Sequence, residues 1–204
     1  MIELLVATHN AHKSREIQEI LGPEFRVSDL TQHPEIPATV ESAATFEENA
    51  KLKAEEASRI FDKLMVIADD SGLEVDALGG APGVHSARYA SKSGEGNADD
   101  AANRQRLLEE LARVEVRGCE RAARFRCAIA LARAGETLAV FHGSVEGIII
   151  NVPKGEGGFG YDPLFVPDGF CETFAQLPAE AKNQLSHRSR ALVQAKEFLQ
   201  TLEH

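Results

Sequence analysis

Short apolar runs alternate along the chain with longer stretches in which apolar residues recur every three or four positions. The first run, residues 2–7, predicts a buried strand. Ile17, Ile20 and Leu21 then share one face of a predicted amphipathic helix, which ends at Gly22-Pro23. Residues 25–30 predict a second strand. The chain therefore opens with a strand, a polar turn and a helix.

The turn between the first strand and the first helix is Thr8-His9-Asn10. Asn10 is a good candidate for the helix N-cap, and the amides of the first helical turn, together with Lys13, would form a cradle for an anion. The glycines and the Lys-Ser/Thr pair of a Walker A loop are absent. An ordinary strand-to-helix junction has the same composition, so the turn alone does not assign phosphate binding.

A second helix is predicted from a capping box, Thr45-Phe46-Glu47-Glu48, to about Phe61, after a predicted loop over residues 31–44 that contains Glu41. Lys53 falls within the apolar stripe of this helix. It is either a lysine that snorkels from the edge of the core or one directed, with Asn49, at an anion in a cleft. The stripe itself consists of Phe46, Ala50, Ala57 and Ile60.

The chain is organised around residues 65–72, where an apolar run leads directly into Asp69-Asp70-Ser71-Gly72. This pattern predicts a buried strand that ends in a polar turn. Adjacent carboxylates on a strand point to opposite faces and repel each other, a cost that a divalent cation or a proton would relieve. An Asx-turn that merely ends a strand would use the same residues.

The second half of the chain predicts a hairpin and a helix. Residues 122–133 and 137–145 read as strands that pair across Ala134-Gly135-Glu136. Residues 145–152 either continue that sheet or add a further strand. Residues 97–111 predict a helix with a purely structural role, whose core contacts are Ala101, Leu107, Leu108 and Leu111.

A glycine-rich segment, residues 154–163, has the most unusual composition of the chain. Its glycines, Gly160 among them, allow the backbone to pass close to a ligand, and Phe159 and Tyr161 would offer faces on which a nucleobase stacks. Asp162 is placed to accept a hydrogen bond from an N–H donor. The alternative is a glycine loop with its aromatic rings in the core.

The last helix is predicted to begin at Ser186-His187-Arg188, shortly after a short helical turn that contains Lys182. Arg188 extends the buried stripe of this helix to its N-terminal end, where the helix dipole disfavours a cation. We therefore expect an anion or an aromatic ring beside Arg188. The rest of the stripe is Leu192, Ala195, Leu199 and Leu202.

Composition narrows the classes of function. The 204 residues are 43% hydrophobic and carry a formal net charge of -10, which argues against a surface that coats nucleic acid or an anionic membrane. Cys119, Cys127 and Cys171 form no C-x-x-C pair, so we expect a reducing compartment. The chain begins without a basic leader and lacks a run of about 18 apolar residues, so a cytoplasmic location is expected.

Two sets of residues point to one chemistry. Glu41, Asp69 and Asp70 suit a hard cation such as Mg²⁺. The second set suits a polyphosphate that carries a flat base, because it combines cations with the aromatic loop. Together they describe a nucleoside triphosphate hydrolase, in which a carboxylate takes a proton from the attacking water. The second set is Asn10, Lys13, Lys53, Lys182, Arg188 and the loop residues 159–162.

Six motifs occur in order over nearly the whole chain. They are Thr8-His9-Asn10 with Lys13, Thr45-Phe46-Glu47-Glu48-Asn49-Ala50 with Lys53-Ala54, Ala68-Asp69-Asp70-Ser71-Gly72-Leu73, Gly79-Gly80-Ala81-Pro82-Gly83 with Ser86-Ala87-Arg88-Tyr89, Gly158-Phe159-Gly160-Tyr161-Asp162-Pro163, and Ser186-His187-Arg188. In this order and spacing the sequence resembles the inosine triphosphate pyrophosphatase family, the dITP/XTP pyrophosphatases. Any one of the motifs alone would be weak.

The resemblance implies an α/β fold with two lobes around a long central mixed sheet flanked by helices, with the active-site cleft between the lobes. Residues 1–204 would form a single nucleotide pyrophosphatase domain and assemble as a homodimer. The implied reaction is Mg²⁺-dependent cleavage of ITP, dITP and XTP between the α- and β-phosphates. It yields a nucleoside monophosphate and pyrophosphate, which removes deaminated purines from the nucleotide pool.

The resemblance also implies roles for individual residues. Asp70 would accept the proton and bind the metal with Glu41, while Lys53 would reach the phosphates and Asp69 would assist. Which of the two aspartates activates the water is open. The implied substrate contacts are Thr8, His9, Asn10, Ala11, His12, Lys13 and Ser71 on the phosphate side, and Phe159, Gly160, Tyr161, Asp162, Lys182, His187 and Arg188 around the base and sugar.

Selectivity for the base follows from hydrogen bonding. A 6-keto purine presents an N1–H donor and an O6 acceptor, which complement a carboxylate such as Asp162 and donors such as His187 and Arg188. Adenine has an acceptor in place of the N1–H donor and a donor in place of the O6 acceptor. It would leave buried protein groups unpaired, which costs about 1–3 kcal/mol of binding free energy per mismatch. Two alternatives stay open: a pyrophosphatase for pyrimidine or methylated nucleotides, and a binding module without hydrolysis.

Overall fold

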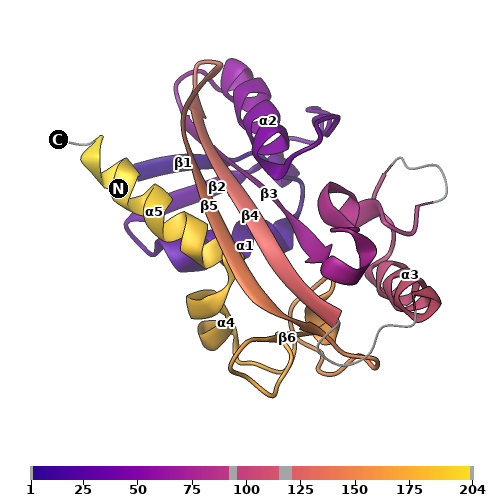
Figure 1. Cartoon of the computed structure of the whole chain (residues 1–204). Coiled ribbons are helices and arrows are strands. Elements are labelled where there is room, and N and C mark those ends of the chain that lie inside the picture. The colour runs from indigo at the N-terminus through magenta and orange to yellow at the C-terminus, as the bar shows by residue number, and fades with distance from the viewer. Residues whose placement is uncertain (1, 92–95, 115–120, 203–204) are drawn as a thin grey trace. The chain divides into compact units, whose positions relative to one another are not determined.

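The computed structural model describes residues 2–91, 96–114 and 121–202; Cys119 lies outside this part of the chain. Within it, six strands form one sheet in the order β2-β1-β3-β4-β5-β6, with helices packed against it (Figure 1). The strands are β1 (Ile2–Val6), β2 (Phe25–Asp29), β3 (Met65–Val75), β4 (Ala122–Arg133), β5 (Glu136–Ile149) and β6 (Phe165–Pro167). The helices are α1 (Ala11–Leu21), α2 (Phe46–Ile60), α3 (Asp100–Arg113), α4 (Ala179–Leu185) and α5 (His187–Thr201).

The sheet is mixed, as expected. β1 pairs in parallel with both β2 and β3, whereas β5 and β6 are antiparallel. β4 and β5 are joined by the tight turn Ala134-Gly135, where both residues have positive φ, so the predicted hairpin is confirmed. β5 continues without a break to Ile149, which answers the open question about the segment after Val145.

The chain divides into two compact units. Unit 1 comprises residues 1–70, 127–143 and 187–204, and unit 2 comprises residues 71–126 and 144–186. Each unit has its own core, as described below. In the part of the chain that the structure describes, no helix has both the length and the apolarity to cross a membrane.

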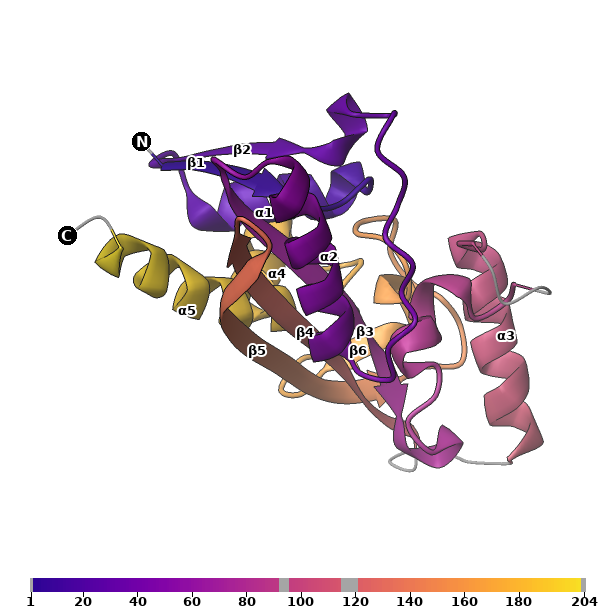
Figure 2. The same cartoon turned by 90° about the horizontal axis from the view of Figure 1, so that it is seen from above.

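In unit 1, alternate residues of the strands point to two different cores. On β4, Cys127, Ile129 and Leu131 face α1 and α5. The intervening Ala128, Ala130 and Ala132 face α2, which presents alanines in return. Figures 1 and 2 show α5 and α2 on opposite sides of these strands. Because both surfaces are built from alanine, α2 packs close to the sheet.

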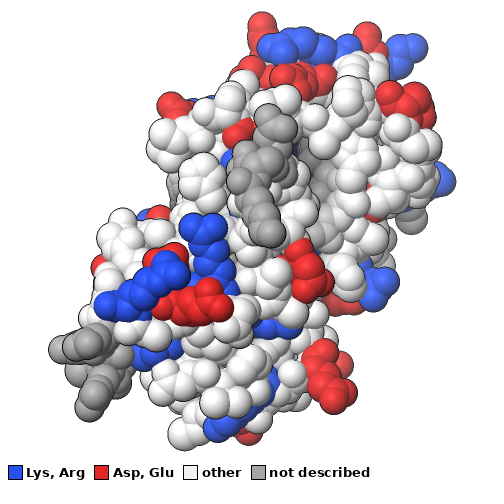
Figure 3. All heavy atoms as spheres, turned by 90° about the vertical axis from the view of Figure 1, so that its right-hand side faces the viewer, with Lys and Arg blue, Asp and Glu red and all other residues white. Residues whose placement is uncertain are grey.

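Unit 2 packs around a group of aromatic rings. The ring centroid of Phe125 lies 4.8 Å from that of Phe165, and Phe165 lies 5.2 Å from Phe174. Leu107 and Leu111 of α3 are fully buried in the same core, and Leu108 packs against it, as predicted. Ala101, also predicted to contact the core, is exposed. On the face shown in Figure 3, basic and acidic side chains lie beside one another rather than in one large patch of a single sign.

The predicted helix starts are confirmed. The side chain of Asn10 accepts hydrogen bonds from the amides of His12 and Lys13 at 2.9 and 3.3 Å, so it is the N-cap of α1. Thr45 caps α2 by accepting from the amide of Glu48 at 3.2 Å, and its hydroxyl donates to the Glu48 side chain. Both contacts satisfy amides that have no partner within the helix.

Two further sequence predictions are wrong. β3 does not end in a polar turn at Asp69 but continues through Asp70 and Ser71 to Val75, because side chains from the neighbouring helices compensate the two charges. Ile60 and Leu202, predicted to be buried, are 57% and 51% exposed. Each lies at the C-terminal end of its helical stripe. Neither belongs to a hydrophobic core cluster of the described residues.

Gly143 on β5 lets α5 rest directly on the strand. A Cβ atom at this position would lie 2.0 Å from the His187 carbonyl oxygen and 2.9 Å from the Ala191 amide nitrogen. Both contacts are with backbone, which cannot move aside by changing a rotamer. We predict that Gly143→Ala lowers the free energy of unfolding by about 1–3 kcal/mol, measured by urea denaturation.

Leu138→Ala is the matched control, since Leu138 lies on the same strand and is 43% exposed. It should change the free energy of unfolding by no more than about 0.5 kcal/mol. Equal stability of Gly143→Ala and the unsubstituted protein would show that α5 can shift without loss.

Candidate active site

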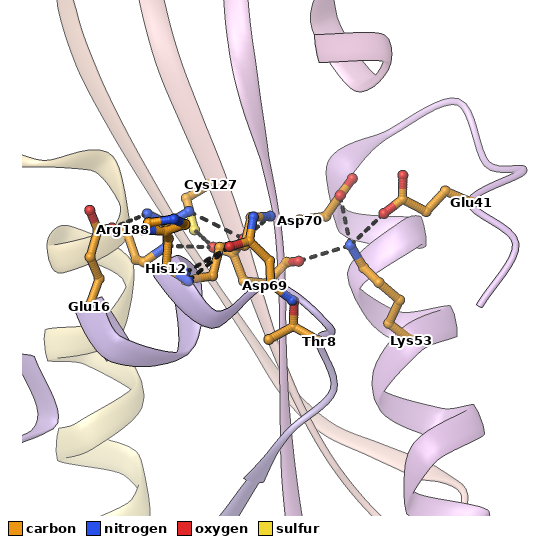
Figure 4. Close-up of polar contacts among 11 residues, drawn as sticks. Thr8, His12, Glu16, Glu41, Lys53, Asp69, Asp70, Cys127 and Arg188 are labelled. Carbon is orange, nitrogen blue, oxygen red and sulfur yellow. Dashed lines mark hydrogen bonds and ion pairs between the residues drawn. The ribbon is translucent and has the colours of Figure 1, made fainter. Parts of the chain in front are cut away.

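The residues predicted to form the site divide between the two units. Asp69 and Asp70 belong to unit 1, together with the α1 turn, Glu41, Lys53, His187 and Arg188. Ser71, the loop residues 159–162 and Lys182 belong to unit 2. Figure 4 shows the polar contacts around the two aspartates, which lie on opposite faces of β3 as their alternation requires.

Asp69 is fully buried among cations. The Nζ atom of Lys13 lies 2.5 Å from its Oδ1 atom, and the Nε atom of Arg188 lies 3.0 Å from its Oδ2 atom. The Cys127 thiol donates a further hydrogen bond to Oδ2 at 3.0 Å. Burial acts to raise the pKa of Asp69, but the charges of Arg188 and Lys13 outweigh it and hold that pKa well below its usual range.

Arg188 is shared between two acids. It lies in the first turn of α5, is 1% exposed, and also pairs with Glu16 of α1 (Figure 4). Burial acts to lower the pKa of this guanidinium, but Asp69 and Glu16 raise it. The expectation of an anion beside Arg188 is thus confirmed. The contacts of Arg188 described here are with protein carboxylates, whereas the resemblance implied contact with the base.

Glu16 and Cys127 were not among the predicted site residues. Glu16 lies one helical turn after Lys13, so the spacing places both on the same side of α1. A buried arginine needs an acidic partner, so the buried position of Arg188 indicated that a carboxylate lies beside it. Several acids in the sequence could have supplied that carboxylate. Cys127 lies 58 positions from Asp69 in sequence, and only the pairing of β3 with β4 brings the two together.

Lys53 lies on the other face of β3, where α2 packs against the alanine surface. Its Nζ atom donates to Asp70 Oδ1 at 2.8 Å, to the Asp69 carbonyl oxygen at 2.8 Å and to Glu41 Oε1 at 3.0 Å (Figure 4). Burial acts to lower the pKa of Lys53, but the charges of Asp70 and Glu41 raise it. Lys53 is therefore a buried partner of acids and not a snorkelling side chain.

Asn49 positions the loop that carries Glu41. Its Oδ1 atom accepts from the amide of Ala43 at 3.0 Å, and its Nδ2 atom donates to the Ala43 carbonyl at 3.4 Å. The fully buried Asn49 side chain therefore ties the loop to α2 two residues after Glu41. This differs from the interpretation that Asn49 faces an anion alongside Lys53.

Asp70 retains an unsatisfied oxygen. Its Oδ2 atom is buried and has no hydrogen-bond partner among the described residues, although Oδ1 is bound to Lys53. Burial raises the pKa of Asp70 more than Lys53 lowers it. A buried carboxylate oxygen without a partner is unfavourable unless a ligand supplies one.

The donors around Asp70 fit a hard divalent cation that keeps part of its hydration shell. Within the described residues there is no group of three or more His, Cys, Asp or Glu side chains that would hold a metal alone. Mg²⁺ commonly uses one or two carboxylates and completes its octahedron with water and phosphate oxygens. Asp70 and Glu41, which share Lys53 as a partner, match that pattern.

The turn before α1 is held by its own contacts. The amide of Asn10 donates to Thr8 Oγ1 at 3.1 Å, and the His9 ring lies 3.1 Å from the Ile36 carbonyl oxygen. Ala11 and His12 are exposed on the first turn. Since Asn10 occupies two first-turn amides, Lys13 is the stronger candidate for an anion contact than the helix terminus alone.

In unit 2, Asp162 organises the predicted base loop. Its Oδ2 atom accepts from the Phe159 amide at 2.9 Å and from Lys182 Nζ at 2.7 Å, and that Nζ lies 4.9 Å from the centroid of the Phe159 ring. A Cβ at Gly158, which has φ of 70°, would lie 2.0 Å from the same oxygen. Glycine at position 158 is therefore required for this loop conformation.

Phe159 and Tyr161 occupy different environments. Phe159 is partly exposed, whereas Tyr161 is 4% exposed, belongs to the unit 2 core and donates its hydroxyl to the Ser86 carbonyl at 2.9 Å. Burial raises the pKa of Tyr161. Tyr161 thus lies in the core, which is the alternative that the sequence left open for the aromatic rings of this loop, whereas Phe159 is only partly buried. Ser71 is a half-buried residue of β3.

The two aspartates should differ in their contribution to stability. Asp69→Asn removes the carboxylate that pairs with the buried Arg188 and with Lys13, so we predict a loss of about 3–5 kcal/mol in the free energy of unfolding. Asp70→Asn removes a charge that is unfavourable because it is buried, and Lys53 still pairs with Glu41. The free energy of unfolding should therefore change by no more than about 1 kcal/mol. Urea denaturation of both variants at pH 7 measures the difference. Equal losses would contradict the division of roles between the aspartates.

Comparisons with known proteins show the family of this chain. The family model described as the Ham1 family matches residues 4–198. A dITP/XTP pyrophosphatase of Geobacter sulfurreducens is 50% identical over 200 residues, which cover 98% of this chain and 97% of the relative. One from Bacillus subtilis is 45% identical over 201 residues, 98% of each chain.

Solved structures give the same result. The Staphylococcus aureus Ham1 protein superposes with a TM-score of 0.81 at 40% identity, covering 98% of both chains. A HAM1 protein from Coxiella burnetii gives 0.84 at 40% identity, covering 98% of this chain and all of the other. The expected fold, a mixed sheet flanked by helices, is therefore confirmed. This chain belongs to the Ham1 family.

Proposed function

We propose that this protein is a Mg²⁺-dependent pyrophosphatase that hydrolyses ITP, dITP and XTP to the nucleoside monophosphate and pyrophosphate. The relatives named dITP/XTP pyrophosphatase support the reaction and the substrate class. The observation that carries the proposal is the state of the Asp70 carboxylate. Its Oδ1 atom pairs with Lys53, while its Oδ2 atom is buried and has no hydrogen-bond partner among the described residues. That oxygen is available both to a metal ion and to a water molecule.

Asp70 and Glu41 would hold the magnesium ion. When bound, Mg²⁺ neutralises the phosphate charge and polarises the phosphoryl oxygens. Lys53, with its Nζ atom fixed by Asp70, Glu41 and the Asp69 carbonyl, presents a positive charge to the triphosphate at the same place. A divalent ion held by the Asp70 and Glu41 carboxylates would add positive charge beside that of Lys53.

Asp70, rather than Asp69, is the proposed proton acceptor. Asp69 is a poor base because Lys13 and Arg188 already neutralise its carboxylate. Asp70 would take a proton from water as the water oxygen attacks the α-phosphorus. The bond from the α-phosphorus to the bridging oxygen breaks, and pyrophosphate leaves with that oxygen. Lys13 would contact the departing phosphates.

The base would bind against the loop residues 159–162. Phe159 offers a ring face, Asp162 accepts from the purine N1–H, and Lys182 and His187 donate to the keto oxygen. Arg188 contributes by holding Asp69 in place. This assignment requires units 1 and 2 to act on a single substrate as one catalytic domain.

The first prediction from this proposal concerns Asp70. Asp70→Asn should reduce pyrophosphate release from ITP by about 10²–10⁴-fold, because general-base catalysis is lost, while ITP affinity stays within a few-fold. A coupled pyrophosphate assay and equilibrium dialysis measure the two quantities. Asp168→Asn, a change at an exposed position, serves as the control. An Asp70→Asn variant with full activity would contradict the assignment, and absence of pyrophosphate release from the unsubstituted protein would favour a binding module.

A nucleotide panel tests the substrate class. With Mg²⁺ present, ITP, dITP and XTP should be hydrolysed at least about tenfold faster than ATP and TTP, since a mismatched base edge costs about 1–3 kcal/mol. EDTA should abolish the activity. Comparable rates with pyrimidine nucleotides would instead support the alternative pyrophosphatase. The resemblance also implies a homodimer, which sedimentation velocity would test.

A further inference from the structure

Helix α3 contacts the backbone of Gly160, in the loop residues 159–162, at both its amide and its carbonyl. The Gly160 amide donates to Asp100 Oδ2 at 2.7 Å, and the Gly160 carbonyl accepts from Arg104 Nη1 at 2.7 Å. Asp100 and Arg104 are four residues apart, so they project from the same side of the helix. Gly160 has φ of 59°, a left-handed conformation that the two contacts fix in place.

The contacts of Gly160 act directly on the residues beside it. Phe159 precedes Gly160, and its carbonyl accepts from the Asp162 amide at 3.2 Å. The Phe159 amide in turn donates to the Asp162 carboxylate. A rotation of the Gly160 peptide would therefore move both the ring of Phe159 and the carboxylate of Asp162.

The consecutive aspartates at the start of α3 have separate tasks. Asp99 is the N-cap, and its side chain accepts from the amides of Ala101 and Ala102 at 3.0 and 3.3 Å. The helix start is thus satisfied without Asp100. Asp100 instead accepts the hydrogen bond from the Gly160 amide. The helix does not need this contact in order to form.

The helix is a firm support for these contacts. Leu107 and Leu111 are fully buried in the unit 2 core. Asn103 accepts from the Ala90 amide at 2.8 Å and donates to the Ala87 carbonyl at 3.1 Å. Asp100 and Arg104 therefore project from a helix whose own position is fixed by packing.

We infer that Asp100 and Arg104 are positioning residues for purine recognition. They hold the Gly160 peptide so that the Phe159 ring and the Asp162 carboxylate keep one relative orientation. Purine selectivity then depends on α3, a helix to which the sequence assigned a purely structural role. This inference rests on the proposed function of the loop residues 159–162 in binding the base.

The test compares ITP with 2-deoxyribose 5-triphosphate, which lacks both the base and the 2′-hydroxyl. Asp100→Ala and Arg104→Met should each lower kcat/KM for ITP by about tenfold, the effect of one hydrogen bond to a charged group. Neither should change kcat/KM for 2-deoxyribose 5-triphosphate, which has no base, by more than about twofold. Asp100→Asn should restore ITP turnover, because its amide oxygen still accepts from the Gly160 N–H.

Two further variants make the result decisive. Gln105→Ala, on the exposed side of α3, should leave both substrates unaffected. Phe159→Ala should lower turnover of ITP alone. If Phe159→Ala leaves ITP unaffected, the proposed base site itself fails. If Phe159→Ala acts on ITP but the two α3 variants do not, or if they lower both substrates equally, the positioning role is overturned.

Discussion

The structure of unit 1 depends on the neutralisation of Asp69 inside the protein. Lys13 and Arg188 approach its carboxylate from helices at opposite ends of the sequence, and the Cys127 thiol approaches it from β4. A buried carboxylate without such partners would be strongly unfavourable. The same contacts join α1, β3 and α5, which also pack together through a shared hydrophobic core.

Because Lys13 and Arg188 neutralise the charge of Asp69, the neighbouring Asp70 has a different electrostatic environment. On the first face of β3, the carboxylates of Asp69 and Glu16 are matched by the cations of Lys13 and Arg188. On the second face, Asp70 and Glu41 both pair with Lys53. The alternation of the strand thus directs Asp69 and Asp70 to two different sets of charged partners.

Much of this arrangement could be predicted from local sequence. The caps at Asn10 and Thr45, the hairpin turn at Ala134-Gly135 and the anion beside Arg188 all follow from short-range rules, and the structure confirms them. Lys53 was placed on the buried stripe by its periodicity, and it is buried. Family resemblance supplied the fold and the substrate class, which the residues alone did not.

The predictions failed where a contact joins distant parts of the chain. Asp69-Asp70-Ser71 resembles a turn because the cations that keep it in a strand lie elsewhere in sequence. Cys127 and Arg104 gave no local signal, since the first acts through strand pairing and the second through a backbone carbonyl 56 positions away. Tyr161 resembled a stacking residue, but its hydroxyl has a partner in the unit 2 core.

The most direct test of the division between the two aspartates is a crystal structure with Mn²⁺ and a non-hydrolysable analogue of ITP. Anomalous scattering locates the metal without ambiguity. The account predicts Mn²⁺ bound to the Oδ2 atom of Asp70, with Glu41 as its second protein ligand and Asp69 still paired with Arg188. Mn²⁺ bound to Asp69, with Arg188 displaced from it, would contradict the account.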